Sequence, residues 1–337
     1  MKSITEYLRA APILLLFALL LFCTGTAVPA AEAGLKLCAE RVVPSLFPLS
    51  VLTNLLLLWL PSEKGNGAER PSCALPLLLA LMGGYPLGAQ TVSRLYQQGA
   101  LSRSDAVRLA RFSNQAGPAF LLGAVGLRQF QSVRFGLLLW VVQLASAGLT
   151  AFCFGLRREN APIKNQLLRS VAMPFSRSLS EAVRRSTGSM LQVCGLVVVF
   201  TTLLAVLRSL PLLCVIPKPV WAVLAGGLEL TGGLALLPET LRSAALPLCA
   251  ILCVWGGLCV HFQSLCFFAD AKLPFGSYLV GKLVQTTVAL PLSCLLAGVF
   301  GLADYGTVFP VSGIVVMILV FFIFFRFLTG NRVKTLL

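Results

Sequence analysis

Apolar residues occur in long runs that are separated by short polar stretches. Several runs approach or exceed the roughly 20 residues that cross the hydrocarbon core of a bilayer. The pattern predicts eight membrane spans, at about residues 10–30, 43–60, 112–127, 135–156, 190–210, 218–237, 277–300 and 307–327. The expected fold is therefore an all-α polytopic membrane protein.

Two further apolar stretches are interrupted by paired glycines. The first, residues 75–95, contains GGYPLGAQ, and the second, residues 246–268, contains WGGLCVHFQ; the breaks fall at Gly83, Gly84, Pro86, Gly256 and Gly257. Broken helix is tolerated in a membrane only where protein or a polar cavity surrounds it. Each stretch is therefore predicted as a re-entrant hairpin that lines a solute site. Close helix packing through small residues is the alternative.

The two hairpins indicate a chain built from two similar halves. Aligning residues 79–95 with 252–268 superposes the two glycine pairs and also Gln90 on Gln263. The expected division is an N-terminal membrane half at 1–156, a basic cytoplasmic linker at 157–189 and a C-terminal membrane half at 190–337. The two halves are interpreted as pseudo-repeats.

A third interruption, SNQAGPAFLLGAVG, begins the span at 112–127. Gly117 and Pro118 break it, and the amides of Asn114 and Gln115 precede the helix that follows. Such amides, beside the positive end of a helix dipole, suit a polar or anionic solute. Simple capping by Ser113 or Asn114 would also explain them.

Polar side chains in apolar surroundings complete the candidate binding site. Glu229 lies within GGLELTGG, and a carboxylate at membrane depth is costly enough to indicate a function, such as carrying a proton or binding a cation. His261 and Gln263 follow the second glycine pair, and Tyr85 follows the first. The expected substrate-binding residues are Tyr85, Asn114, Gln115, Glu229, His261 and Gln263.

Composition supports the membrane assignment and excludes other classes. Hydrophobic residues make up 57% of the 337 residues and charged residues only 12%, about half the usual share of a soluble domain. The formal charge of +15 lies in loops: residues 94–111 carry a net +3 and residues 157–185 a net +5. Both are expected to be cytoplasmic, and no nucleic-acid motif accompanies them. The 11 cysteines include no C-x-x-C pair, and the sole histidine, His261, has no partner at zinc-site spacing, so no metal site is predicted. Nothing resembles a nucleophile with a base at workable spacing, so no catalytic residue is predicted, and no cofactor is expected.

The N-terminus resembles a signal peptide, because Lys2 and Arg9 precede an apolar core and Val28 to Ala30 reads VPA. An uncleaved first helix is the simpler interpretation for a chain with many later spans. Both termini are placed in the cytoplasm, which agrees with the charge pattern if each hairpin enters and leaves on one side.

Five stretches together resemble the YlbJ family of sporulation integral membrane proteins, which carry a nucleoside-recognition "Gate" type of segment. The most specific runs from Gly83 to Gly126 and combines the glycine break, a short basic helix and an Asn before a proline. The others are residues 44–52, 179–200, 226–233 and 255–285. The resemblance implies a bacterial membrane protein of endospore formers, in the mother-cell or outer forespore membrane, associated with spore cortex formation.

Two functions are compatible with these features. The first is a transporter or permease for a small polar solute, coupled to a proton or cation. The second is a non-transporting scaffold or assembly factor for cortex synthesis. The expected partners are the lipid bilayer, the solute, and a second copy of the chain or other sporulation membrane proteins.

Overall fold

A computed structural model describes residues 2–59, 74–154 and 174–305, and every regular element within them is helical. Five helical stretches among these residues are long and apolar enough to cross a membrane: Thr24–Leu58, Val133–Cys153, Phe175–Ser209, Arg242–Asp270 and Phe275–Val299. The expected spans at 135–156, 190–210 and 277–300 overlap members of this set. The expected span at 307–327 lies outside the described residues.

The first long stretch is a single helix. After α1 (Lys2–Phe22), α2 (Thr24–Leu37) continues through a π-helical turn (Cys38–Val42) into α3 (Val43–Trp59). The expected separation of spans 10–30 and 43–60 is therefore wrong. The intervening residues are rich in Ala, Leu, Glu, Lys and Arg, which favour helix, so their polarity does not end it.

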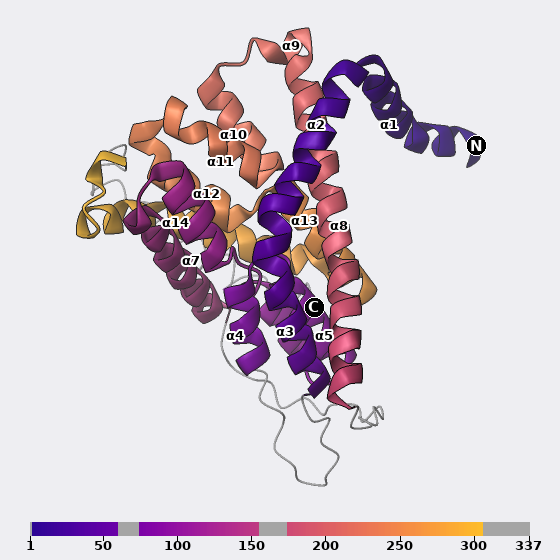
Figure 1. The fold of residues 1–337 in the computed structure, drawn as a ribbon, viewed down its shortest axis with the longest axis vertical. Coiled ribbons are helices and arrows are strands. Elements are labelled where there is room, and N and C mark those ends of the chain that lie inside the picture. Colours follow the sequence, from indigo (N-terminus) through magenta and orange to yellow (C-terminus); the bar gives the residue numbers. More distant parts are fainter. Residues whose placement is uncertain (1, 60–73, 155–173, 306–337) are drawn as a thin grey trace.

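Helix α8 (Phe175–Ser209) lies beside this long helix and runs in the opposite direction (Figure 1). The α-carbon of Val198 lies 3.1 Å from where a Cβ on Gly34 would be, and Asn54 donates a 2.7 Å hydrogen bond to Ser186. Because α8 begins at Phe175, the last part of the expected linker at 157–189 is helical. Pro174, which precedes the helix with an extended backbone, marks its start.

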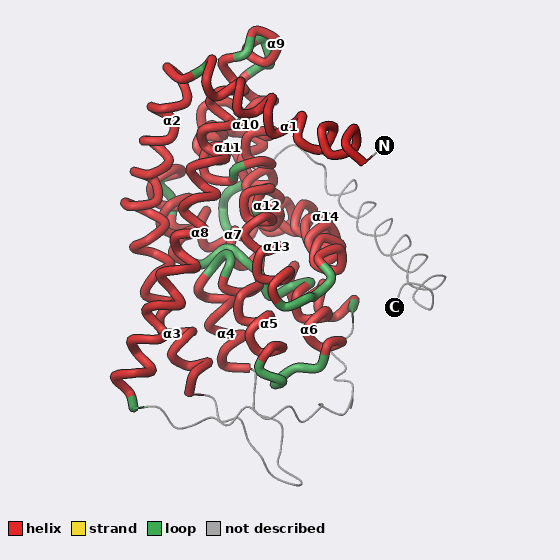
Figure 2. Tube along the Cα trace, turned by 90° about the vertical axis from the view of Figure 1, so that its right-hand side faces the viewer, coloured by secondary structure: helices red, strands yellow, loops and turns green. Residues whose placement is uncertain are grey.

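Two pairs of short helices form hairpins whose tips meet within the protein. In the first half, α4 (Ala74–Gly83) and α5 (Leu87–Gln97) are joined by three residues. In the second half, Glu229 alone joins α10 (Lys218–Leu228) to α11 (Leu230–Thr240). Figure 2 places the first pair in the lower half of the molecule and the second in the upper half.

The expected span at 218–237 is thus a hairpin. Gly233 lies directly against the backbone of Gly226, so the glycines allow the two helices to pack closely. A helix of 11 residues is about 16 Å long at about 1.5 Å per residue, only half of a bilayer core. The apolar run was long enough for one span, but its extended residue at Glu229 divides it.

A broken helix follows each hairpin. Residues 111–118 separate α6 (Arg103–Ala110) from the π-helical segment η2 (Ala119–Gln129), and Gly256 separates α12 (Ala245–Trp255) from α13 (Gly257–Asp270). Helix α12 packs against α7 (Val133–Cys153) and α14 (Phe275–Val299), whereas α13 packs against α5 and α8. The second glycine pair therefore bends the chain instead of forming the expected side-by-side hairpin at 246–268.

The same order of elements occurs twice. Residues 24–153 and 175–299 each contain a long helix, a hairpin, a broken helix and a spanning helix. Because the long helices are antiparallel and the hairpins lie in opposite halves of the molecule, the repeats are inverted. In this repeat Gly84, at the tip of the first hairpin, corresponds to Glu229, at the tip of the second. The alignment of residues 79–95 with 252–268, which pairs Gly84 with Gly257, is therefore wrong. Glycine matches in apolar sequence are too frequent to fix the register of a repeat.

Candidate functional site

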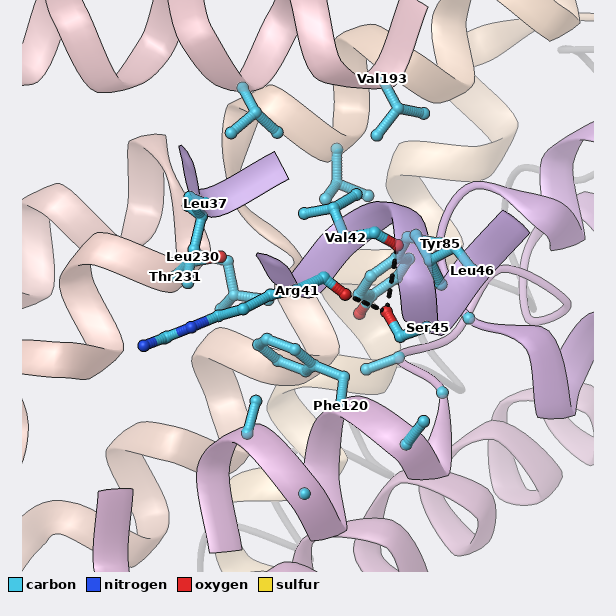
Figure 3. Close-up of a pocket in the computed structure, with 18 of the residues that line it drawn as sticks. Leu37, Arg41, Val42, Ser45, Leu46, Tyr85, Phe120, Val193, Leu230 and Thr231 are labelled. Atoms are coloured by element: carbon cyan, nitrogen blue, oxygen red, sulfur yellow. Dashed lines mark hydrogen bonds between the residues drawn. The ribbon is translucent and has the colours of Figure 1, made fainter. Parts of the chain in front are cut away.

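A cavity of about 350 Å³ is lined by the two hairpin tips, the first helix break, α13 and the two long helices (Figure 3). Of the predicted binding residues, Tyr85, Glu229 and Gln263 line it, as do the break residues Gly84 and Gly117. Val193 from α8 and Phe120 from η2 contribute apolar walls, and Figure 3 shows them on opposite sides. The cavity therefore has a mainly apolar surface with a few polar groups, as small-molecule sites have.

Tyr85 closes the cavity on the side of the broken helices. It is 8% exposed, and its hydroxyl donates to the main-chain oxygen of Cys253 in the last turn of α12. The ring of Tyr85 lies about 3.3 Å from where a Cβ on Gly256 would be. The first hairpin is thus fastened to the helix break of the other repeat by one aromatic side chain.

Glu229 caps the N-terminus of α11 at the tip of the second hairpin. Its carboxylate accepts hydrogen bonds from the main-chain N–H groups of Thr231 (3.0 Å) and Gly232 (2.7 Å), and the residue is 4% exposed. A carboxylate is stabilised there by the helix dipole as well as by the two bonds. The geometry gives Glu229 a structural role together with a place in the cavity wall.

Gln263 is the third predicted residue in the cavity, and it reaches the wall from α13. Its amide nitrogen lies 3.4 Å from the sulfur of Cys259, one turn earlier. Thr231 of α11 also lines the cavity and extends into a second cavity of about 290 Å³, which Arg41 and Arg128 border too. The main cavity therefore opens toward a more polar compartment at the side of the second hairpin.

The glycines at the breaks permit close approach of the backbones. Gly84 has a φ of +92°, and a Cβ on it would lie 3.0 Å from the main-chain nitrogen of Gly117. Gly257, with a φ of +77°, packs in the same way on the main-chain oxygens of Gly226 and Leu228 at the second hairpin. Pro86 and Pro118, the other predicted break residues, directly precede α5 and η2.

Asn114, Gln115 and His261 do not line the cavity. They belong to a fully buried polar network behind Tyr85, in which Asn114 donates to Ser264 (2.8 Å) and to the hydroxyl of Tyr278 (3.3 Å). His261 Nδ1 lies 3.1 Å from the same hydroxyl. The structure thus divides the six predicted residues into a group of three at the cavity and a group of three in this network.

Three residues of α14, Tyr278, Lys282 and Gln285, were missed by the sequence reasoning. They recur at helical spacing, are 0% exposed and hold the network together. Gln285 forms a reciprocal pair with Gln115, at 2.8 Å and 3.0 Å. The sequence carries a signal for them, since a lysine within an apolar span is as costly as a glutamate there.

Metal-ligating groups do not gather at this site. Within the described parts of the chain, no three His, Cys, Asp or Glu side chains lie together in a way that could hold a metal ion. The sole histidine, His261, contacts Trp255 and Tyr278.

Comparison with known proteins gives a curated relative. The chain is 29% identical to the sporulation integral membrane protein YlbJ of Bacillus subtilis strain 168, over 337 aligned positions that cover 84% of this chain and 82% of the relative. No protein-family profile matches the chain, and no solved structure does. Together with the apolar helices, the relative identifies a multi-pass membrane protein.

Proposed function

Since this chain is a YlbJ-like membrane protein, we propose that it is a transporter or permease for a small polar solute and acts in spore cortex formation. One observation carries the proposal: both hairpin tips and the first helix break of an inverted repeat line one cavity, together with α13, which follows the second break. Transporters commonly place their substrate at such interruptions, near mid-membrane. Packing alone would not require a cavity at the point where the two hairpin tips come together with a helix break.

Polar side chains line the cavity close to the interruptions. Tyr85 and Thr231 lie at the two hairpin tips, and Gln263 lies on α13. In this proposal both hairpins are re-entrant, as the Gate-type resemblance implies, and Glu229 takes up a proton or cation that moves with the solute. Both termini lie in the cytoplasm, and the protein acts in the outer forespore membrane.

A scaffold or assembly factor for cortex synthesis is the second candidate. The observation that favours it is the basic start of α8, where Arg177, Arg184 and Arg185 extend from an exposed helical surface. Glu181 pairs with two of these arginines, yet the surface keeps a positive charge that an acidic partner would fit. This role would need the basic surface and not the cavity.

Complementation of a gene deletion separates the two functions. The deletion is made in the spore-forming host, and heat-resistant spores are counted after complementation with the wild type or with variants of confirmed expression. Thr231→Val and Gln263→Leu change cavity chemistry while keeping shape, and Thr287→Val on the exposed side of α14 is the matched control. Transport predicts failure of the cavity variants alone. Full complementation by them, with failure of Arg177→Ala/Arg184→Ala, would favour the scaffold.

A further inference from the structure

Lys282 is a buried lysine that the proposed transport cycle does not use. It lies about two turns into α14, is 0% exposed, and reaches the point where both broken helices are interrupted. None of the ion pairs among the described residues involves it. A buried ammonium without a carboxylate needs another source of stabilisation, because desolvation of a charge is costly.

Three oxygen atoms provide that stabilisation. The ammonium donates to the main-chain oxygen of Asn114, to that of Val254 at 3.1 Å and to Oε1 of Gln285 at 3.4 Å. Asn114 lies in the break before η2, and Val254 lies in the last turn of α12, where the helix dipole places partial negative charge. The three donors of the ammonium thus meet three acceptors, two of them freed by helix breaks.

The acceptors are held in place independently of the lysine. Gln285 is fixed by its reciprocal pair with Gln115 and by a 3.3 Å hydrogen bond to Ser146. Val254 is also approached by the hydroxyl of Tyr85 at 3.4 Å, and the ring of Tyr85 lies 5.4 Å from the ammonium. These oxygens form a preorganised cluster rather than a set gathered by a flexible side chain.

We propose that Lys282 fills an alkali-cation site formed by the carbonyls of two broken helices, so that the protein carries its own cation at this position. The ligands are neutral oxygens, which are the atoms that hard cations prefer. Because no carboxylate contributes, the site suits a single positive charge rather than a divalent ion. Removal of the ammonium leaves a cation-shaped vacancy that Na⁺ or K⁺ enters with water.

Purified full-length protein tests the inference without any transport assay. Thermal unfolding in detergent is compared in sodium, potassium and choline chloride at equal ionic strength, for the wild type, Lys282→Ala and Lys282→Met. We expect the wild type to unfold at the same temperature in all three salts, and the alanine variant to gain about 2–4 °C or more in sodium or potassium. The methionine variant, whose side chain fills the vacancy, is expected to be less stable but indifferent to the salt.

The pattern across variants decides the outcome. Lys36→Ala, at an exposed lysine of α2, controls for the loss of a lysine elsewhere. An alanine variant that is indifferent to the salt overturns the proposal, and so does an equal response of the alanine and methionine variants. If Lys282→Ala is too unstable in choline, it is extracted directly into each salt: monodisperse protein in sodium or potassium alone supports the site, and none in any salt overturns it. Failure here leaves the proposed transport untouched, because that rests on the cavity.

Discussion

Gly123 offers a direct test of whether the cavity carries the function. It lines the cavity from η2, and a Cβ built on it would meet no atom within 4 Å. A large side chain at this position would therefore extend into the cavity instead of disturbing the packing. Gly148 of α7 also has open space around it and is exposed outside the cavity, so it is the matched control.

The size of the change follows from the volumes. A tryptophan side chain brings ten non-hydrogen atoms in two fused rings into a cavity of about 350 Å³. Gly123→Trp therefore leaves much less room for a solute. Replacing a helical glycine also removes a conformational cost of roughly 0.5–1 kcal/mol, so neither variant should lose stability on that account.

The assay is spore heat resistance in the complemented deletion, with membrane insertion and thermal stability measured for both variants. We expect Gly123→Trp to insert normally and to fail as the deletion does, whereas Gly148→Trp complements. A Gly123→Trp protein that supports normal numbers of heat-resistant spores would refute the transport proposal, because the bulky ring obstructs the cavity through which the solute would pass.

Three further substitutions test individual contacts. Gly84→Ala should lower the free energy of unfolding by about 1–2 kcal/mol, because the φ of Gly84 is +92° and a Cβ would lie 3.0 Å from Gly117. Gly227→Ala is the control: Gly227 has open space around it, so the unfolding temperature should stay the same or rise. Glu229→Gln removes one of the two acceptors that cap α11 and should lower the free energy of unfolding by roughly 1 kcal/mol. The same variant should fail to complement the deletion. Normal sporulation would exclude proton or cation coupling through this carboxylate. Asn114→Ala should lower stability by about 1–3 kcal/mol, since it leaves buried polar partners unpaired, and an unchanged unfolding temperature would contradict the network.

The positions of the helix breaks could be predicted from the sequence, but their three-dimensional form could not. Glycine and proline act locally, so Gly84, Gly117 and Gly256 were identified as interruptions, and the structure breaks the helices there. Whether the chain reverses or bends depends on the packing partners of the next helix. The reversal at Glu229 was missed because an extended residue between two glycine-rich runs has no local signature as strong as a proline.

The site was predicted in part for a similar reason. Polar residues in apolar surroundings can be identified from the sequence. Three of those predicted in this way, Tyr85, Glu229 and Gln263, line the cavity. Sequence distance could not show that Asn114 and His261 lie behind Tyr85, since that depends on the contact between the two halves. Lys282 was overlooked because its span was assessed for length and not for the cost of its one charge.

The contacts between the two halves of the chain can form only after the second half has been synthesised. Gln115 and its partner Gln285 are 170 residues apart in sequence, and Asn114 and Lys282 are 168 apart. At about 5–20 residues per second of synthesis, the first broken helix waits roughly 10–30 s before its partners leave the ribosome. During that time its polar backbone must be sheltered by water, by lipid head groups or by the insertion machinery. The slowest and most error-prone moment in the life of this protein is therefore expected to be the arrival of α14.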